Sequence, residues 1–149
     1  MNKSIDSAMT KEPMSIAPDV SLQDAMEIMR SWGMRHLPVT GKQGEVIGLF
    51  TERDLWRYQA LHPGEKASVR DAMTENPFVV GPDTSLAEVA EKMARHKYGC
   101  AIVAGENGLC GIFTTTDALE ILAQLLRDPN DRGFRVMRIE DYIRTRAVA

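Results

Sequence analysis

The chain repeats itself, and this internal repeat constrains the fold more than any other feature of its sequence. A shift of 64 residues aligns the first half with the second. Pairs aligned at this shift include Pro13 with Pro77, Pro18-Asp19 with Pro82-Asp83, and Met29 with Met93. After a turn the shift becomes 63, and the aligned pairs include Gly48 with Gly111, Thr51 with Thr114, and Asp54 with Asp117. Two copies are too few for a solenoid. The sequence therefore predicts two similar halves related by a pseudo-two-fold axis.

Each copy predicts the same order of elements: a short strand, a helix, two strands joined by a turn, and a second helix. The first short strand ends at Pro18, because a residue before proline is pushed toward extended backbone. Ser21 stands at an N-cap position before apolar residues at helical spacing, and Gly33 is placed to end that helix. Gly-containing turns then join two apolar stretches in each copy, which is typical of a hairpin.

The expected fold class is α/β (α+β), with two tandem β-α-β-β-α repeats that each hold a small mixed sheet and two helices. We predict the first repeat over residues 5–62, a polar linker over 63–68, and the second repeat over 69–127. Residues 128–149 are expected to form a loop and a short helix around 139–143, packed on the repeats or on a partner.

Composition and motifs exclude several classes of function. With 149 residues and a net charge of -3, the chain has no overall electrostatic attraction to nucleic acid or to anionic lipid. No apolar stretch approaches the roughly 18–20 residues of a membrane helix. The two cysteines, Cys100 and Cys110, are expected to be free thiols, which suits a reducing cytoplasm. The sequence has no nucleophile elbow, Gly-rich phosphate loop or metal-ligand cluster, so neither catalysis nor a metal site is expected.

The repeated pattern resembles the CBS domain family, whose tandem pairs are called Bateman modules. The matching segments are Ala8-Met9-Thr10 with Pro13, Leu37-Pro38-Val39, and the closing motifs 48–54 and 111–117. They cover roughly residues 5 to 126, although Ala101-Ile102-Val103 lacks the proline of the first copy. The resemblance implies two quasi-equivalent clefts between the repeats, a homodimer, and a regulatory adenosyl ligand such as AMP, ADP, ATP or S-adenosylmethionine rather than a cofactor.

The closing motifs carry the first candidate site residues, Thr51 with Asp54 and Thr114 with Asp117. As a Thr-x-x-Asp pattern, each is explained by a capping box at a helix start. The resemblance implies a second role, in which the Asp carboxylate accepts hydrogen bonds from the ribose hydroxyls and the Thr lies near ribose or phosphate. The two roles are compatible, because the Thr can cap the helix while the Asp faces the cleft.

Arg35 and His36 are the second candidate pair. By the resemblance they face the cleft that holds Asp117, where a guanidinium would bind phosphate in a bidentate manner. The equivalent residues of the second copy are Gly99 and Cys100, so the two clefts are expected to differ. We expect the Asp117 cleft to favour anionic ligands, and the other cleft to depend on Arg53 and Lys97. The alternative for Arg35 is a solvated surface charge.

The resemblance assigns adenine recognition to backbone groups of Ser15 and Ile16 and of Val79 and Val80. The alternative is that these are short core strands. Trp32 and Trp56 are candidates for a dimer face or for partly buried packing within the monomer.

Together with this composition, the resemblance implies a cytoplasmic adenine-nucleotide sensor that signals by ligand-dependent conformational change. The regulated partner is not visible in the sequence. The alternative is a structural dimerisation module without a ligand. Both use an apolar face on the last predicted helix, formed by Ala118, Leu119, Leu122, Leu125 and Leu126.

Overall fold

The computed structural model of the chain describes residues 3–127, and the predicted C-terminal helix around 139–143 lies outside them. The chain divides into two compact units after Ala118. The first unit contains both repeats up to the first turn of the last helix. The second begins within that helix.

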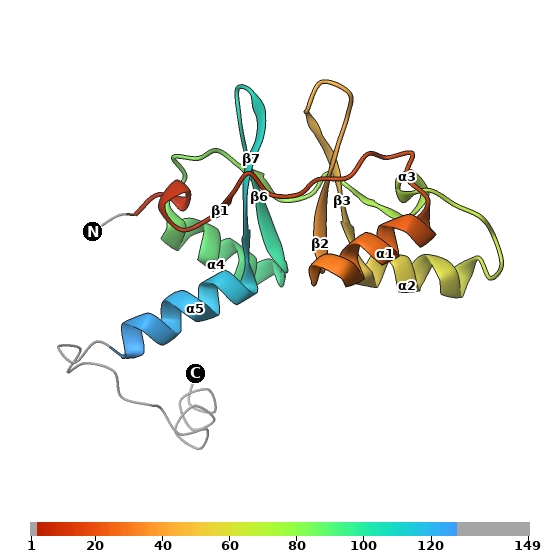
Figure 1. Cartoon of the computed structure of the whole chain (residues 1–149). Coiled ribbons are helices and arrows are strands. Elements are labelled where there is room, and N and C mark those ends of the chain that lie inside the picture. The colour runs from red at the N-terminus through yellow and green to blue at the C-terminus, as the bar shows by residue number, and fades with distance from the viewer. Residues whose placement is uncertain (1–2, 128–149) are drawn as a thin grey trace, which may run out of the picture. The chain divides into compact units, whose positions relative to one another are not determined.

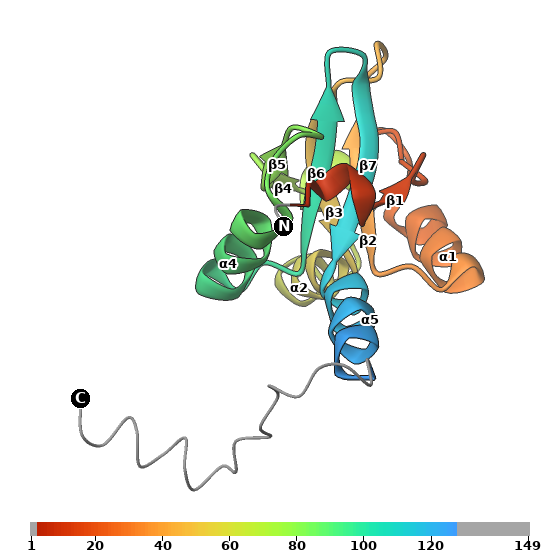
Figure 2. The ribbon, with the colours of Figure 1, turned by 90° about the vertical axis from the view of Figure 1, so that its left-hand side faces the viewer.

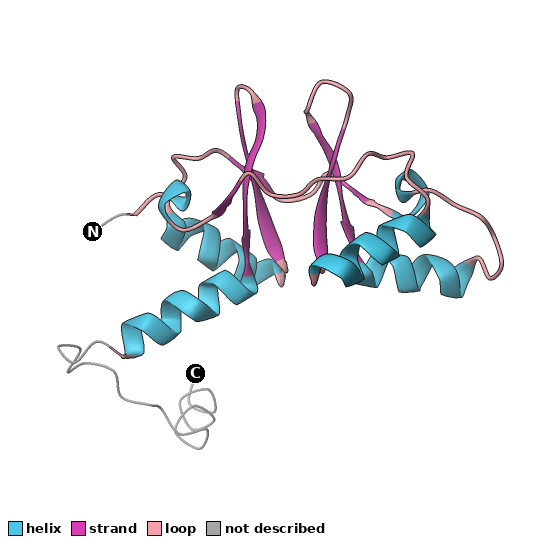
Figure 3. Ribbon diagram, in the orientation of Figure 1, coloured by secondary structure: helices cyan, strands magenta, loops and turns pink. Residues whose placement is uncertain are grey.

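The longer helices and the hairpin strands follow the predicted order in both copies (Figures 1 and 3), but the short first strand predicted at Ser15-Ile16-Ala17 is reduced to an isolated bridge at Ile16. The elements of the first copy are a 3-10 helix η1 (Ile5–Ser7), β1 (Thr10–Lys11), α1 (Leu22–Trp32), β2 (His36–Thr40), β3 (Val46–Thr51) and α2 (Glu52–Leu61). Those of the second copy are α3 (Val69–Ala72), β4 (Thr74–Glu75), β5 (Val79–Val80), α4 (Leu86–His96), β6 (Cys100–Gly105), β7 (Gly108–Thr114) and α5 (Thr115–Leu126). The mixed α+β fold with two tandem repeats is confirmed. The short helix and two-residue strand that open each copy were not predicted; we call these openings the lead segments, residues 3–12 and 67–76.

Helix α1 begins and ends as its sequence favours, whereas the equivalent helix α4 ends at a residue whose conformation its side chain disfavours. Ser21 caps α1 by accepting a hydrogen bond from the Asp24 backbone N–H at 3.1 Å. Gly33 ends α1 in the left-handed conformation, with φ of 63°. Lys97 takes the same conformation at the end of α4, with φ of 58°, although it carries a side chain. Such a conformation favours glycine, so Lys97 is held there against its intrinsic preference.

The two lead strands are exchanged between the repeats. One sheet has the strand order β1-β7-β6-β5, so that β1 of the first copy pairs with β7 of the second (Figure 2). The other has the order β2-β3-β4, so that β4 of the second copy pairs with β3 of the first. An isolated parallel bridge between Ile16 and Val39 corresponds to the parallel pairing of β5 with β6.

The helices of the lead segments are exchanged as well. Val69 and Ala72 of α3 are buried in the core of the first repeat, with Leu22, Leu37 and Phe50. The Val69 backbone N–H donates to the Val20 carbonyl at 2.8 Å. In the same way, Ile5 is fully buried and its N–H donates to the carbonyl of Thr84 at 2.8 Å. Each repeat therefore completes its core only with the lead segment of the other.

Two equivalent glycines permit this exchange. Met73 lies across Gly48 of β3, and a Cβ at residue 48 would stand 2.7 Å from the Met73 sulfur. Met9 lies across Gly111 of β7 in the same manner, in space that a Cβ would fill. A side chain at either glycine would have to displace the methionine that lies across it.

The part of α5 in the second unit is apolar and exposed. The side chains of Leu119, Leu122, Leu125 and Leu126 are 64%, 43%, 59% and 44% exposed. Despite this apolar surface, no helix among residues 3–127 is long and apolar enough to span a membrane.

Candidate functional site

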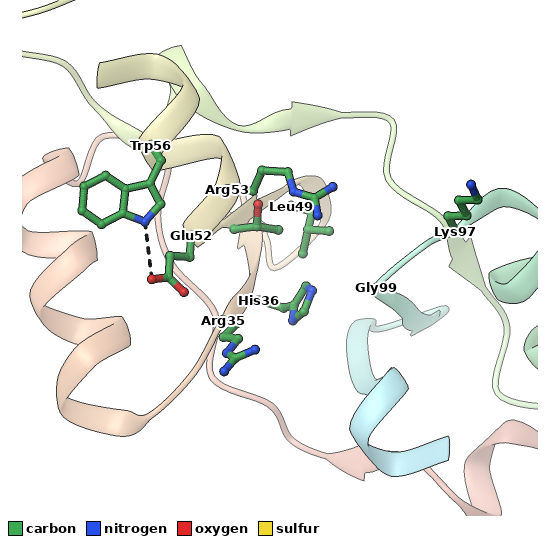
Figure 4. Close-up of a pocket in the computed structure, with 9 residues that line it drawn as sticks. Arg35, His36, Leu49, Glu52, Arg53, Trp56, Lys97 and Gly99 are labelled. Atoms are coloured by element: carbon green, nitrogen blue, oxygen red, sulfur yellow. Dashed lines mark hydrogen bonds between the residues drawn. The ribbon is translucent and has the colours of Figure 1, made fainter. Parts of the chain in front are cut away.

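Two pockets of the first unit contain most of the predicted site residues. The pocket that we call the Asp117 pocket has a volume of about 580 Å³; its lining includes Thr10, Glu12, Met14, Arg35, His36, Thr114 and Asp117. The one that we call the Arg53 pocket has a volume of about 640 Å³; its lining includes Arg35, His36, Thr51, Glu52, Arg53, Trp56, Lys97 and Gly99 (Figure 4). Both volumes are typical of small-molecule sites.

Asp117 is half-buried and keeps one carboxylate oxygen available. Its Oδ2 accepts hydrogen bonds from the Thr114 backbone N–H at 2.7 Å and from Thr114 Oγ1 at 3.1 Å. The Asp117 N–H donates back to Thr114 Oγ1 at 3.3 Å, which completes the predicted capping box. Within residues 3–127, Oδ1 accepts no hydrogen bond. The capping contacts thus fix the carboxylate and leave Oδ1 for a ligand.

Asp54 is buried, with 5% of its surface exposed, and all of its acceptor sites are used. Its Oδ2 accepts from the Thr51 N–H at 2.9 Å and from Thr51 Oγ1 at 2.8 Å, as in the second copy. Its Oδ1 accepts from Arg57 Nη2 at 3.0 Å and from Thr74 Oγ1 at 3.2 Å. A carboxylate has about four lone-pair sites, so none remains. Asp54 also does not line the Arg53 pocket.

Arg35 and His36 form a wall that the two pockets share. The His36 ring reaches across to Gly99 of the second repeat, where a Cβ would stand 2.6 Å from Nε2. Burial lowers the pKa of His36 below its ordinary value of 6.5, the Arg35 charge lowers it further, and the Asp54 charge opposes them. His36 is therefore neutral at pH 7 and becomes a stronger phosphate ligand only once it gains a proton.

The Arg53 pocket is the more cationic of the two. Arg35, Arg53 and Lys97 line it against one acid, Glu52, which accepts a 3.4 Å hydrogen bond from the Trp56 indole. The Arg53 and His36 side chains point toward the segment just before β6 that contains Gly99 (Figure 4). In the Asp117 pocket, by contrast, Arg35 faces the acids Glu12 and Asp117. The sequence predicted the Asp117 cleft to be better for anions, but the structure places more positive charge in the other.

The four residues predicted to contact adenine line neither pocket. Ile16 is buried and uses both backbone groups, donating to Pro38 O at 2.9 Å and accepting from Thr40 N at 3.1 Å. Ser15 accepts a hydrogen bond from Thr40 Oγ1 at 3.3 Å. Val79 is 41% exposed, and Val80 pairs with β6. The roles of Ser15, Ile16, Val79 and Val80 stay predictions.

Sequence reasoning missed four residues near the two aspartates. Thr10 of β1 and Glu12 directly after it reach the Asp117 pocket, and Thr74 of β4 reaches Asp54, through the exchanged lead segments. The alignment of Thr10 with Thr74 was the available signal. Arg57 was also missed, although an arginine three residues after a helical acid is a recognised ion-pair spacing. In the described part of the chain, no group of three or more acidic, His or Cys side chains is placed to hold a metal.

Comparison with known proteins identifies the class. The family model described as the CBS domain matches residues 3–58 and again residues 69–124. The two matches cover most of the chain, which therefore belongs to the CBS domain family as a tandem pair.

Solved structures and curated relatives agree with this membership. A protein from Vibrio cholerae described as an acetoin utilization protein superposes with a TM-score of 0.77 at 28% identity, over 85% of this chain and 94% of that one. A CBS domain pair in complex with 5′-methylthioadenosine and S-adenosyl-L-methionine gives 0.76 at 21% identity, over 84% and 99%. CBSX2 from Arabidopsis thaliana, in complex with AMP, gives 0.71 at 24% identity, over 83% and 98%.

The matching curated relatives include the inosine-5′-monophosphate dehydrogenase of Bifidobacterium longum, 30% identical over 117 residues. Those residues are 77% of this chain but 21% of the dehydrogenase. The chain thus spans about a fifth of that relative, and the dehydrogenase activity is not transferred to it.

Proposed function

We propose that the protein is a regulatory module that binds an adenine nucleotide in the Asp117 pocket. The ribose hydroxyls donate to Asp117 Oδ1, and the α-phosphate lies against Arg35 and His36 on the shared wall. The observation that carries the proposal is the half-satisfied carboxylate of Asp117, which is fixed by Thr114 and open to a pocket that also holds a guanidinium. A charged acceptor makes such hydrogen bonds stronger than a neutral one does.

Further phosphates extend from the shared wall into the Arg53 pocket. Arg35 and His36 line both pockets, and beyond them Arg53 and Lys97 supply two more positive charges. Glu12 and Asp117 offset the charge of Arg35 in the Asp117 pocket. The β- and γ-phosphates are therefore attracted more strongly by the Arg53 pocket than by the Asp117 pocket. We therefore expect ATP and ADP to bind more tightly than AMP.

The ligand acts by joining parts of both repeats. Thr10 comes from the exchanged lead strand, Arg35 precedes β2 of the first repeat, and Asp117 lies on the second. A nucleotide that contacts all three favours one arrangement of the repeats over others, and this differential affinity is the signal that a partner protein senses. The cytoplasm, where the ligand is abundant and the free thiols of Cys100 and Cys110 stay reduced, is the proposed location.

A structural dimerisation module is the second candidate. The exposed leucines of α5 favour it, as does Trp56 of α2, which is 54% exposed and aligns with Leu119 in the repeat. Equivalent apolar residues at equivalent positions suit a two-fold interface with a second copy of this chain. Dimerisation and nucleotide binding are compatible, so only the absence of binding would separate the two candidates.

A thermal-shift series over AMP, ADP, ATP and S-adenosylmethionine tests the proposal. A ligand that binds only the folded state at a hundredfold excess over Kd adds about 2.7 kcal/mol, which raises the melting temperature by several degrees. We expect ATP to give the largest shift. If no ligand shifts the melt at millimolar concentration, the dimerisation module replaces the sensor.

A further inference from the structure

The two halves of the module treat their equivalent aspartates in opposite ways. Thr51 and Thr114 make the same capping contacts to Asp54 and Asp117. The difference lies at Oδ1, which in Asp54 accepts from Arg57 and Thr74 and in Asp117 accepts from no described residue. The capping box therefore does not explain the asymmetry, whereas the two additional donors do.

Of the two additional donors to Asp54, only Arg57 has no equivalent donor in the other repeat. Thr74 has an equivalent in Thr10, which lines the Asp117 pocket. The residue equivalent to Arg57 is Glu120, three residues after Asp117 as Arg57 is three residues after Asp54. A guanidinium at this position neutralises the aspartate carboxylate and donates a hydrogen bond to its Oδ1. A glutamate can do neither.

From these contacts we infer that Arg57 closes the Asp54 site to nucleosides, so that each chain binds one nucleotide, at Asp117. The inference rests on the proposed function, because it assigns the ribose to an aspartate. The Arg57 guanidinium competes for the oxygen that a ribose would need, and Asp54 is withdrawn from the Arg53 pocket. That pocket keeps its cations but lacks a ribose acceptor, so it receives phosphate and not a second nucleoside.

The test is the stoichiometry of ATP binding, measured by calorimetry and native mass spectrometry on the full chain. The wild-type protein is expected to bind one ATP per chain. Arg57→Met keeps the aliphatic stem and removes the guanidinium, so a second, weaker binding event should appear. Arg57 has 62% of its side chain exposed, and the substitution should leave the fold intact. Lys92→Met is the matched control, because it breaks the surface pair of Lys92 with Glu88 outside both pockets and should leave one site.

Two more variants assign the sites. Adding Asp54→Asn to Arg57→Met should remove the second event, and Glu120→Arg should weaken the first event about tenfold by placing a guanidinium three residues after Asp117. Two equal sites in the wild type, or one site in Arg57→Met, would overturn the inference and leave the proposed function standing. Binding by Arg57→Met alone would support the closure at Asp54 and overturn the assignment to Asp117. No binding by either protein would overturn both.

Discussion

The His36 imidazole of the first repeat lies directly on Gly99 of the second, in the space that a side chain at residue 99 would fill. Gly99 aligns with Arg35, so the second repeat has no side chain where the first has a guanidinium. This difference lets His36 cross between the repeats and form the shared wall of both pockets.

Gly99→Ala should weaken nucleotide binding more than it weakens the fold. A Cβ 2.6 Å from His36 Nε2 would displace the imidazole, which is the movable end of its side chain. We expect the affinity for ATP to fall about five- to tenfold, and the free energy of unfolding to change by less than about 1 kcal/mol. Calorimetry and urea denaturation measure the two effects. Gly105→Ala, at a glycine with open space around it, is the control; equal losses in both variants would contradict the role of His36.

The two aspartates should separate binding from stability. Asp117→Asn should weaken ATP binding by a factor on the order of 10 to 100, because the ribose loses a charged acceptor. Asp54→Asn should leave that binding event in place but lower the free energy of unfolding by about 1–3 kcal/mol, since four internal hydrogen bonds are disturbed. Arg35→Ala should weaken the same event as Asp117→Asn. Loss of binding in Asp54→Asn alone would reverse the assignment of the pockets.

Nucleotide binding should strengthen as the pH falls toward 6. His36 has a pKa below 6.5 in the free protein and is neutral at pH 7. A phosphate beside His36 raises its pKa. Nucleotide binding is therefore accompanied by proton uptake at pH values between the pKa of His36 in the free protein and its pKa in the complex. The charged groups around His36 are Arg35, Arg53, Lys97, Asp54 and Glu52, with Glu12 and Asp117 on the other side of the wall. Calorimetry in buffers of different ionisation enthalpy measures the uptake, and it should vanish in His36→Asn.

The same pKa predicts the sign of a stability effect without ligand. The unfolded chain protonates His36 near pH 6.5, and the folded chain does so only at lower pH. Below pH 6.5 the unfolded state therefore binds more protons, and this histidine lowers the stability as the pH falls through the window between the two values. The free energy of unfolding of His36→Asn, measured by urea denaturation, should therefore fall less between pH 7 and lower pH than that of the wild type. An equal pH dependence in the two proteins would contradict the lowered pKa of His36.

Lys97→Gly should make the protein more stable and its ATP affinity weaker. The residue sits at φ of 58°, where Gly33 serves in the first repeat, so glycine should relieve about 1 kcal/mol of strain and raise the melting temperature by a few degrees. The lost charge should weaken ATP binding several-fold and AMP binding little. If Lys97→Gly weakened the binding of ATP and of AMP equally, the placement of the β- and γ-phosphates in the Arg53 pocket would be wrong.

The protein should sediment at about twice its chain mass of 16.6 kDa at micromolar concentration. Exposed leucines on α5 and the equivalent Trp56 on α2 supply the apolar surface. Leu119→Asp with Trp56→Asp should yield monomers, and Leu61→Asp, at another exposed apolar residue, is a control that should not. A wild-type monomer in sedimentation would exclude the dimer.

Most of the fold could be predicted from the sequence because the two halves repeat the same pattern. Helix caps such as Ser21 and Gly33 depend on neighbours a few residues away, and these were predicted where the structure has them. Lead strands of two residues have too little periodicity to predict, and β1 pairs with a partner about a hundred residues later, at Ile112. Thr10 and Thr74 were missed for this reason.

At the site, sequence could identify the equivalent residues and the substitution of Arg35-His36 by Gly99-Cys100, but not the contacts that surround each aspartate. Asp54 and Asp117 align, and their capping contacts are alike. Whether Oδ1 is occupied depends on the rotamer of Arg57 and on a strand from the other repeat, neither of which a local pattern contains. The sharing of Arg35 and His36 by two pockets likewise follows only from how the repeats pack.

The exchange of lead strands has a consequence for synthesis on the ribosome. When residues 1–60 have emerged, the first repeat still lacks Val69, Ala72 and β4, which complete its core and its sheet. Thr10 and Lys11 meanwhile have no strand partner until β7 is made, because they pair with Ile112 and Gly111. The nascent chain therefore reaches its native state only when nearly all of the pair has been translated, and a ribosome-bound fragment ending at residue 65 should remain sensitive to protease.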